Sequence, residues 1–382
     1  MKIYTWYSLL SRKQRFWLCG TILTMILITA IGILGDISNK PVHGKSYTID
    51  MTLKEIAPDL NVTGKALAGE LGLPAQLKGA GKRPIRELGV SQENLDKVVE
   101  HLLSHKGTML KYYIFAALFL GGLMFMVKLG RPEMSEVKQR TDWYPVAPYL
   151  FILIISVIAA GFYLGKSPNP MEGVVKVFKS IAGLYPDPWV KLGAFIFFIA
   201  LAIIGNKIIC GWACPYGALQ ELIYSLPVLK KAKKNLRLSF IITNTIRAVL
   251  FLLVLLILFG VLGNKKGFVL YHDMNPFNLF DLKFGSLWIS LTVIITLAGA
   301  FIFYRPFCRF ICPFGLFSWL AERISIFRVR IDRDKCTDCG QCISACPLGA
   351  AGDMVQGKRL PEDCFSCARC LNKCPVDAIK FK

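Results

Sequence analysis

The most informative motifs of the sequence are two cysteine-rich runs: Cys336–Pro347, CTDCGQCISACP, and Cys364–Pro375, CFSCARCLNKCP. Each has the spacing C-x-x-C-x-x-C-x-x-x-C-P. Thiolates are soft, strongly donating anions, and three of them on one tight loop wrap one corner of an iron–sulfur cubane. A zinc ribbon needs only four ligands in C-x-x-C pairs, so two complete four-cysteine runs favour iron–sulfur clusters.

In two-cluster domains with this spacing, the first three thiolates of each run hold one cluster and the fourth crosses to the other. We therefore expect two [4Fe-4S] clusters with the ligand sets Cys336, Cys339, Cys342 and Cys374 for cluster one, and Cys364, Cys367, Cys370 and Cys346 for cluster two. Residues 336–379 resemble the bacterial 2[4Fe-4S] ferredoxins, including Ala378-Ile379 after the last Cys-Pro. The resemblance implies a small α+β ferredoxin domain over 331–382.

The rest of the chain is strongly apolar. Of 382 residues, 54% are hydrophobic and 19% charged, whereas about 25% are charged in an ordinary soluble domain. A helix crosses a bilayer with roughly 17 to 25 apolar residues. Six stretches qualify, which predicts a mainly α integral membrane protein with six transmembrane helices: 16–35, 111–129, 147–165, 190–209, 244–263 and 286–304.

The charge pattern predicts the orientation of these spans. The net charge is +21, an excess that would suggest nucleic-acid binding in a soluble protein. Here the positive charges cluster beside spans, which is typical of cytoplasmic loops. We expect a multi-pass protein of the cytoplasmic (inner) membrane with both termini and the ferredoxin domain in the cytoplasm, residues 36–110 outside, and no nucleic-acid partner.

Five segments follow from this topology. Residues 1–35 are interpreted as a cytoplasmic segment and an uncleaved signal-anchor helix. Residues 36–110 are expected to form a small outward-facing helical domain for docking or packing, with a Thr52–Glu55 capping box and a Ser91 cap. The remaining segments are 111–146, the second span and its loop; 147–330, the other four spans; and 331–382, the ferredoxin domain.

Four further cysteines form a second type of motif. Cys210–Gly217 reads CGWACPYG and Cys308–Gly315 reads CRFICPFG, each after a predicted span. Residues four apart lie on one face of a helix, and we expect the proline after each pair to stop that helix. Disulfides are a poor explanation on the cytoplasmic side, where thiols stay reduced. The thirteenth cysteine, Cys19, is interpreted as a small buried hydrophobe.

The two motifs belong to a longer internal repeat. Asn169-Pro170 precedes Cys210 by 41 positions and Asn275-Pro276 precedes Cys308 by 33, with an amphipathic stretch and one span between them in each copy. This order predicts two duplicated hairpins of the same orientation, which in membranes are related by an axis along the normal.

Such an axis would bring four thiolates to one place. We therefore consider a third iron–sulfur cluster in the membrane region, with Lys207, Arg305 and Arg309 offsetting the negative charge near the helix C-termini. Two alternatives stay open: thiols without a cluster, and transient handling of a soft metal such as copper(I). The ligand set in question is Cys210, Cys214, Cys308 and Cys312.

The outer loops hold the polar candidates for a quinone site: Asn169, Met171, His272, Asp273 and Asn275. An equally good reading makes the Asn-Pro pairs turns that cap the next helix. The chain has four histidines, none in a predicted span, and no C-x-x-C-H, which argues against haem. No Gly-rich dinucleotide loop and no Walker-type phosphate loop is present.

The combination of two C-x-x-x-C-P motifs with a double-cluster tail resembles the NapH/NosR family of membrane ferredoxin-type proteins. The likeness covers residues 147–382 and includes SPNPME at 167–172. It implies electron transfer between the quinone pool, or cytoplasmic donors, and redox partners on either face, as in a quinol dehydrogenase subunit. The chain lacks the flavin domain of NosR, so no flavin is expected, and it adds a first hairpin that the shorter NapH pattern lacks.

Two other classes of function are kept beside this one. The first is a metal-reducing or assembly factor that uses the membrane cysteines. The second is a passive ferredoxin-type anchor for a soluble oxidoreductase.

Overall fold

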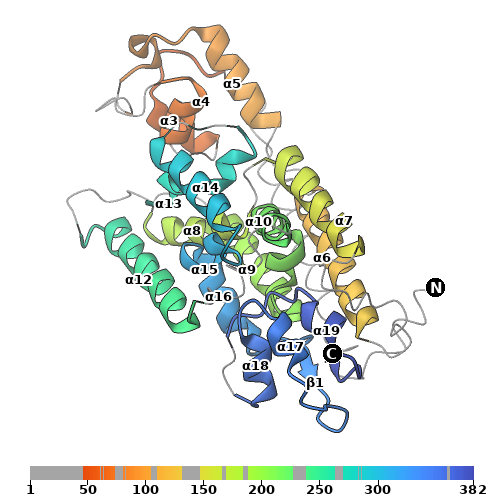
Figure 1. Cartoon of the computed structure of the whole chain (residues 1–382). Helices are drawn as coiled ribbons and strands as arrows, with labels where there is room; N and C mark the ends of the chain where they lie inside the picture. Colours follow the sequence, from red (N-terminus) through yellow and green to blue (C-terminus); the bar gives the residue numbers. More distant parts are fainter. Residues whose placement is uncertain are drawn as a thin grey trace. The chain divides into compact units, whose positions relative to one another are not determined.

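The structure is a computed structural model of the whole chain (Figure 1). It describes residues 46–60, 62, 64–73, 81, 83–104, 110–130, 147–165, 169–183, 188–226, 238–262, 270–282, 284, 286–358 and 362–382. The chain divides into two compact units. Of the described residues, those within 111–175 and 194–382 form one unit, and those within 46–110 and 176–193 form the other. The predicted first span, 16–35, and Cys19 lie outside the described residues.

The unit that contains the predicted outward domain is helical. Its elements are α3 (Leu53–Asp59), α4 (Gly64–Glu70), η2 (Ile85–Leu88) and α5 (Gln92–Ser104). Its hydrophobic core consists of Leu53, Ile56, Ala57, Leu60, Leu67, Leu71, Ile85, Val90, Leu95 and Val99.

The predicted Ser91 cap is confirmed, and the predicted Thr52–Glu55 box forms one of its two bonds. The Thr52 amide donates to Oε2 of Glu55 at 2.8 Å, and the Asn94 amide donates to Oγ of Ser91 at 3.3 Å. Each bond satisfies an amide that the first turn of a helix leaves without an internal partner.

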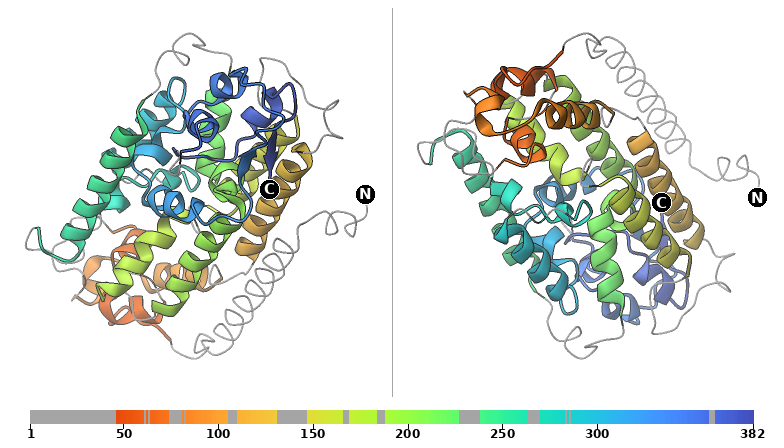
Figure 2. Two further views of the ribbon diagram at one scale, coloured as in Figure 1. Left: turned by 90° about the horizontal axis from the view of Figure 1, so that it is seen from below. Right: turned by 90° about the horizontal axis from the view of Figure 1, so that it is seen from above.

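The larger unit contains most residues of the apolar helices, while residues 176–181 and 188–193 belong to the other unit. Their bounds are α6, Leu110–Leu129; α7, Ala147–Ile155, continued by π-helical η4, Ser156–Tyr163; α8, Pro170–Ile181; α9, Pro188–Gly205; α12, Phe240–Leu258; α13, Leu270–Asp273; 3₁₀-helical η6, Pro276–Leu279; and α14, Leu287–Gly299. Figure 2 shows two further views of them.

Two described helices are long and apolar enough to cross a bilayer, Lys111–Leu129 and Phe240–Leu258. Three other predicted spans coincide with shorter apolar helices, Pro148–Tyr163, Lys191–Gly205 and Leu287–Gly299. A helix of 13 residues such as α14 rises only about 20 Å, less than the ~30 Å of a bilayer core. The six-span arrangement therefore remains a prediction.

Each C-x-x-x-C-P motif joins two short helical segments. These are η5 (Ile209–Ala213) with α10 (Pro215–Ser225), and α15 (Pro306–Phe310) with α16 (Pro313–Glu322). After α16 the chain runs into the cysteine-rich tail, which is blue in Figure 1.

The tail is a small α+β domain. It contains β1 (Val329–Ile331), α17 (Gln341–Ala345), α18 (Ala350–Val355), α19 (Arg369–Lys373) and β2 (Ile379–Phe381). The strands pair antiparallel with Val329 opposite Phe381 and Ile331 opposite Ile379. The two ends of the domain are thus tied together.

The segment before β1 is bonded to the helical bundle. The amides of Ile326 and Phe327 donate to the carbonyls of Ile203 and Ile204 at 2.8 and 2.9 Å. These carbonyls lie in the last turn of α9, where the helix offers no internal donor. The tail is therefore attached to the bundle through its backbone as well as through side chains.

Candidate metal centres

The two ferredoxin runs adopt the same backbone conformation. The second residue after the first cysteine, Asp338 or Ser366, has a positive φ of 50° in both runs. Gly340 and Ala368 are left-handed as well and are the N-cap residues of α17 and α19. These left-handed positions bend each loop tightly enough for its first three cysteines to surround one space.

One cavity of the tail is lined by sulfur from both runs. Its walls include Cys336, Cys339, Cys342 and Cys374, with Ile331 and Ile343 among the apolar neighbours. The fourth cysteine comes from the other run. These are the four residues that the spacing assigned to cluster one.

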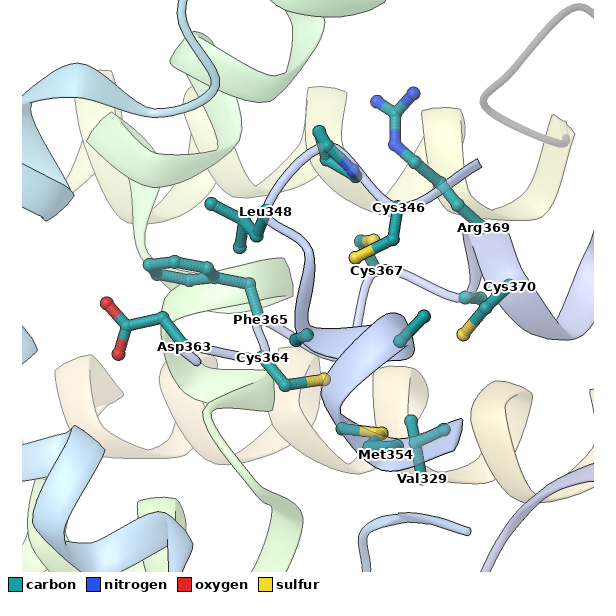
Figure 3. Close-up of a pocket in the computed structure, with 14 residues that line it drawn as sticks. Val329, Cys346, Leu348, Met354, Asp363, Cys364, Phe365, Cys367, Arg369 and Cys370 are labelled. Atoms are coloured by element: carbon teal, nitrogen blue, oxygen red, sulfur yellow. The ribbon is translucent and has the colours of Figure 1, made fainter. Parts of the chain in front are cut away.

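A second cavity is lined by the other four tail cysteines, Cys364, Cys367, Cys370 and Cys346. Their sulfur atoms face a common space in Figure 3, with Leu348, Met354 and Val329 beside them. The crossing residue here is Cys346. The structure therefore brings together both predicted ligand sets, each with three cysteines from one run and one from the other.

The donor set of each cavity fits a [4Fe-4S] cubane, which takes one thiolate at each of four irons. Within the described ranges, no three Cys, His, Asp or Glu side chains are grouped closely enough to hold a single metal ion. The cavity walls other than sulfur are mostly apolar and backbone, an environment that limits solvent access to a cluster.

In both C-x-x-x-C-P motifs a helical segment stops before the proline, as predicted: η5 ends at Ala213 and α15 at Phe310. Pro215 and Pro313 are also the first residues of the next helices, α10 and α16, so the two cysteines of a pair do not share one helix face. Proline suits this position because the missing N–H would have no partner there. The preceding cysteines, Cys214 and Cys312, are the extended N-cap residues, with φ, ψ of −72°, 118° and −67°, 115°.

The glycine that closes each motif has a steric reason. A Cβ at Gly217 would lie 2.6 Å from the Cys210 carbonyl oxygen, and one at Gly315 would lie 2.7 Å from that of Cys308. No side chain fits at either position without movement of the backbone. The last residue of C-P-[YF]-G therefore packs on the first cysteine of the motif.

All four motif cysteines are buried, with 7 to 9% of their surface exposed: Cys210, Cys214, Cys308 and Cys312. Burial raises the pKa of the Cys214 thiol to about 12, and the charge of Cys308 acts in the same direction. For Cys210, burial and then the charges of Cys214, Cys308 and Cys312 raise the pKa. The four thiols from the two motifs thus lie within electrostatic reach of one another.

Polar groups surround these thiols. The Gln220 amide Nε2 lies 3.6 Å from Sγ of Cys308, and its Oε1 accepts from the Phe307 amide at 3.0 Å. The Tyr271 hydroxyl is buried without a hydrogen-bond partner among the described residues. Burial and then the charge of Cys312 raise the pKa of Tyr271. An iron–sulfur cluster bound here would offer sulfur as a hydrogen-bond acceptor to this hydroxyl.

The two motif segments contact each other reciprocally. Lys207 and Arg305 each stand three residues before the first cysteine of their motif. Lys207 lies 3.4 Å from Glu322 on α16, and Arg305 lies 3.1 Å from Glu221 on α10. Each cation thus pairs with a carboxylate that follows the other motif.

A second pair of contacts is also reciprocal between the two motif segments. The Tyr216 hydroxyl is 2.5 Å from Oγ1 of Thr296, and the Phe314 ring meets that of Phe198 edge-on at 6.2 Å. Tyr216 and Phe314 occupy the same place in the two motifs, and Phe198 and Thr296 both stand 12 residues before the first cysteine.

Arginine side chains also hold the motif backbone. Arg305 Nη1 donates to the Cys210 carbonyl at 2.5 Å, and Arg247 Nη1 donates to the Cys308 carbonyl at 3.1 Å. Arg309 instead donates to the Leu238 carbonyl at 3.0 Å. Two of the three cations predicted to offset charge therefore lie at the motifs in buried ion pairs, and Arg309 bonds to a loop.

The ferredoxin tail sits on the same motif ends. Trp212 Nε1 donates to the Ser366 carbonyl at 2.9 Å, and Arg369 Nη2 donates to Glu221 at 2.5 Å. Asp363 pairs with both Lys207 and Arg247. Burial opposes ionisation of Asp363, but Lys207 and Arg247 outweigh it and lower the pKa of this carboxyl.

Sequence reasoning missed these carboxylates and Arg247. Arg247 is fully buried in α12. A lone charge inside an apolar span is a functional signal on general grounds, so Arg247 could have been singled out. Glu221 and Glu322 carry no comparable signal, because a single acidic residue in a short amphipathic stretch is ordinary.

The two asparagines of the predicted quinone site act as caps. Asn169 Oδ1 accepts from the Glu172 amide at 2.8 Å at the start of α8, and Asn275 Oδ1 accepts from the Phe277 amide at 3.1 Å at the start of η6. The geometry thus follows the capping alternative. Met171 is buried and His272 exposed.

The η6 segment, which the topology places in an outer loop, packs directly on a cysteine motif. The Tyr216 ring lies 5.8 Å from the Phe277 ring and 6.5 Å from that of Phe280. Aromatic side chains near the Asn275 turn therefore pack on the motif that begins at Cys210.

Comparison with known proteins matches both C-x-x-x-C-P motifs and the first cysteine run of the tail. A 4Fe-4S binding domain model matches residues 188–235 and a 4Fe-4S dicluster domain model matches residues 306–350. The ferredoxin-type protein NapH of Haemophilus influenzae is 26% identical over 56% of this chain and 79% of its own length. The regulatory protein NosR of Stutzerimonas stutzeri is 31% identical over 40% of this chain and 22% of its own.

Another relative is the methylamine utilization ferredoxin-type protein MauN of Methylobacillus flagellatus, 30% identical over 38% of this chain and 50% of its own length. No solved structure matches the chain. The fold, the sulfur-lined cavities and these matches define a ferredoxin-type iron–sulfur protein of electron transfer. Within that class the chain is similar to polyferredoxins of the NapH/NosR type.

Proposed function

We propose that this chain is a membrane-bound electron carrier that passes electrons between the quinone pool and a redox partner, with two [4Fe-4S] clusters in its tail. The observation that carries the proposal is the crosswise lining of the two tail cavities, with Cys374 in the first and Cys346 in the second. When bound, such clusters accept and release single electrons without breaking bonds.

The chain's own residues hold and insulate these positions. The left-handed residues Asp338 and Ser366 shape the ligand loops. Phe365 and Leu371 are buried beside the second set of cysteines. Dry surroundings and fixed ligands limit the rearrangement that accompanies a change of charge.

Membrane insertion is supported by the outer faces of two helices. On α12, Ile241 is 74% exposed, while on α14 Leu287 and Ile295 are 73% and 64% exposed. Arg247, on the same helix α12, is turned inward and fully buried. Lipid would cover such apolar faces, which soluble monomers rarely expose over a large area. The proposed topology keeps six spans with both termini and the tail in the cytoplasm.

A third cluster at the membrane motifs is part of the proposal. Cys210 and Cys214 from one motif and Cys308 and Cys312 from the other would supply four thiolates. Their burial, the orphaned hydroxyl near Cys312 and the reciprocal pairing of the motif segments support it.

The second candidate is a metal-reducing or assembly factor, and one observation favours keeping it. The four motif thiols are buried near one another, and thiols are the ligands that a soft metal such as copper(I) prefers. Iron content separates the two candidates. Three tetranuclear clusters require about twelve irons per chain and two require about eight.

The test uses the intact chain, purified without oxygen in detergent. We expect about twelve irons, falling to about eight in the Cys210→Ser, Cys308→Ser double variant. Eight irons in both proteins, with Cys210 and Cys308 reactive toward a thiol reagent, would support the metal-handling factor. Absence of any [4Fe-4S] signal in the electron paramagnetic resonance (EPR) spectrum of the reduced protein would overturn the proposal.

Quinone exchange is tested separately in lipid nanodiscs. Menadiol should bleach the visible absorption of the clusters in the intact chain. If menadiol leaves the spectrum unchanged while dithionite bleaches it, quinol oxidation is wrong and a passive anchor becomes the better description.

A further inference from the structure

The two ligand loops of the tail have opposite surroundings. Between the first two cysteines of the first run, Thr337 and Asp338 are exposed, with 72% of the Asp338 side chain accessible. At the same place in the second run, Phe365 and Ser366 are 2% and 1% exposed. Cys339 is itself exposed. One loop therefore faces solution and the other is covered by protein.

The second loop is covered by the segment that contains the motif Cys210–Gly217. Ser366 is bonded on both sides: its carbonyl accepts from Trp212 Nε1 at 2.9 Å, and its hydroxyl donates to the Asn206 carbonyl at 2.6 Å. Trp212 lies between the two cysteines of CGWACP, and Ser366 lies between Cys364 and Cys367. The hydrogen bond from Trp212 to the Ser366 carbonyl thus directly joins the two cysteine loops.

Two further contacts hold the second loop in place. The Cys364 amide donates to the side-chain carboxylate of Glu322, on α16 after the other motif, at 3.2 Å. A Cβ on Gly211 would overlap the Phe365 carbonyl oxygen, so only glycine allows this approach. The second loop of the tail is therefore packed backbone against backbone on the segment that begins at Cys210.

We propose that the two clusters of the tail exchange electrons with different partners. The cluster held by Cys364, Cys367, Cys370 and Cys346 exchanges electrons with the membrane part, and the cluster held by Cys336, Cys339, Cys342 and Cys374 exchanges them with a soluble partner protein. This order rests on the proposed function, because it requires a cluster in each cavity. Each transfer moves one electron from a reduced to an oxidised centre, and no bond is made or broken.

Two mild substitutions identify the two tail clusters by their EPR signals; a signal that is lost in the Cys210→Ser, Cys308→Ser variant belongs to the C-x-x-x-C-P motifs and is set aside. Asp338→Asn removes a negative charge beside Cys336, whose Sγ lies 3.5 Å from Asp338 Oδ1, and asparagine tolerates the left-handed backbone there. It should raise the potential of one signal. Trp212→Phe keeps a ring but removes the donor to Ser366. It should lower the potential of the other signal by roughly a threefold to tenfold change in the reduction equilibrium, up to about 59 mV.

Accessibility is then measured on the unmodified chain in nanodiscs. A soluble gadolinium chelate, added to dithionite-reduced protein, should speed the spin relaxation of the signal that Asp338→Asn shifts and act far less on the one that Trp212→Phe shifts. Trp288→Phe is the matched control, because Trp288 is 65% exposed on α14. It should move neither signal.

Three results would overturn this assignment of partners to the two clusters: both substitutions shift the same signal, Trp212→Phe shifts none, or gadolinium relaxes both signals equally. A reduced protein without any [4Fe-4S] signal is a different outcome, because it refutes the proposed function itself.

Discussion

Arg247, in the apolar helix α12, places its Nη1 3.3 Å from Oδ2 of Asp363, the residue before Cys364. Both side chains are buried, at 0% and 2% exposure, and Lys207 pairs with the same carboxylate. A charge pair out of water stabilises only when both partners are present. The pair therefore ties the second ligand loop to the helical bundle.

Replacing Asp363 by asparagine should loosen that attachment. The change leaves Arg247 and Lys207 buried with one carboxylate fewer, at a cost of about 3 to 5 kcal/mol. Hydrogen exchange of the amides in 363–370 should become faster. Asp334→Asn, an exposed position two residues before Cys336, is the matched control and should leave exchange unchanged. Equal protection in both variants would show that the pair does not anchor the tail.

The motif glycines give a second prediction. Gly315→Ala places a methyl group 2.5 Å from Arg247 Nη1 and 2.7 Å from the Cys308 carbonyl, which should cost about 1 to 3 kcal/mol. Thermal unfolding in detergent measures this as a lower Tm. Gly193→Ala, on α9, meets nothing within 4 Å and should be neutral or stabilising by up to about 1 kcal/mol. If the two variants have the same Tm, the steric explanation for Gly315 is wrong.

The tail could be predicted in detail because its geometry is local. The spacing within each run determines which cysteines share a loop, and the structure places both predicted groups of four, with Cys346 and Cys374 exchanged, around separate cavities. Left-handed Ser366 and Ala368 could not be foreseen, since neither residue type signals a positive φ.

The membrane motifs were only partly predictable. A proline after cysteine predicts that a helix stops before it, as η5 does at Ala213, but it does not reveal that the next helix starts at the proline itself, as α10 does at Pro215. The pairs Lys207–Glu322 and Arg305–Glu221 join residues that are 115 and 84 positions apart. No local pattern marks such partners, because the fold alone brings them together.

The asparagine caps give a test that separates capping from quinone binding. Asn275→Asp retains an oxygen that accepts from the Phe277 amide and should leave the Tm nearly unchanged, while Asn275→Ala should cost about 1 kcal/mol. Asn169→Asp and Asn169→Ala, at the start of α8, should behave in the same way. If the aspartate variants keep their Tm but lose bleaching by menadiol, the asparagines contact the quinone as well.

The reciprocal ion pairs predict a measurable coupling. Burial opposes ionisation of Glu221, but Arg369 and Arg305 outweigh it and lower the pKa of the carboxyl, so Glu221 is charged at neutral pH. Glu221→Gln should therefore destabilise the protein by about 3 to 5 kcal/mol, since two guanidinium groups lose their partner.

A double-mutant cycle with Arg369→Gln isolates one arm of this cluster. Arg369 Nη2 lies 2.5 Å from Glu221 Oε1, whereas Arg305 binds Oε2. Urea unfolding of the single and double variants should give a coupling of about 1 to 3 kcal/mol. Arg333→Gln, whose guanidinium is half exposed beside Asp338, is the control and should show no coupling to Glu221. Additive losses for Glu221 and Arg369 would mean that their contact does not hold α19 against α10.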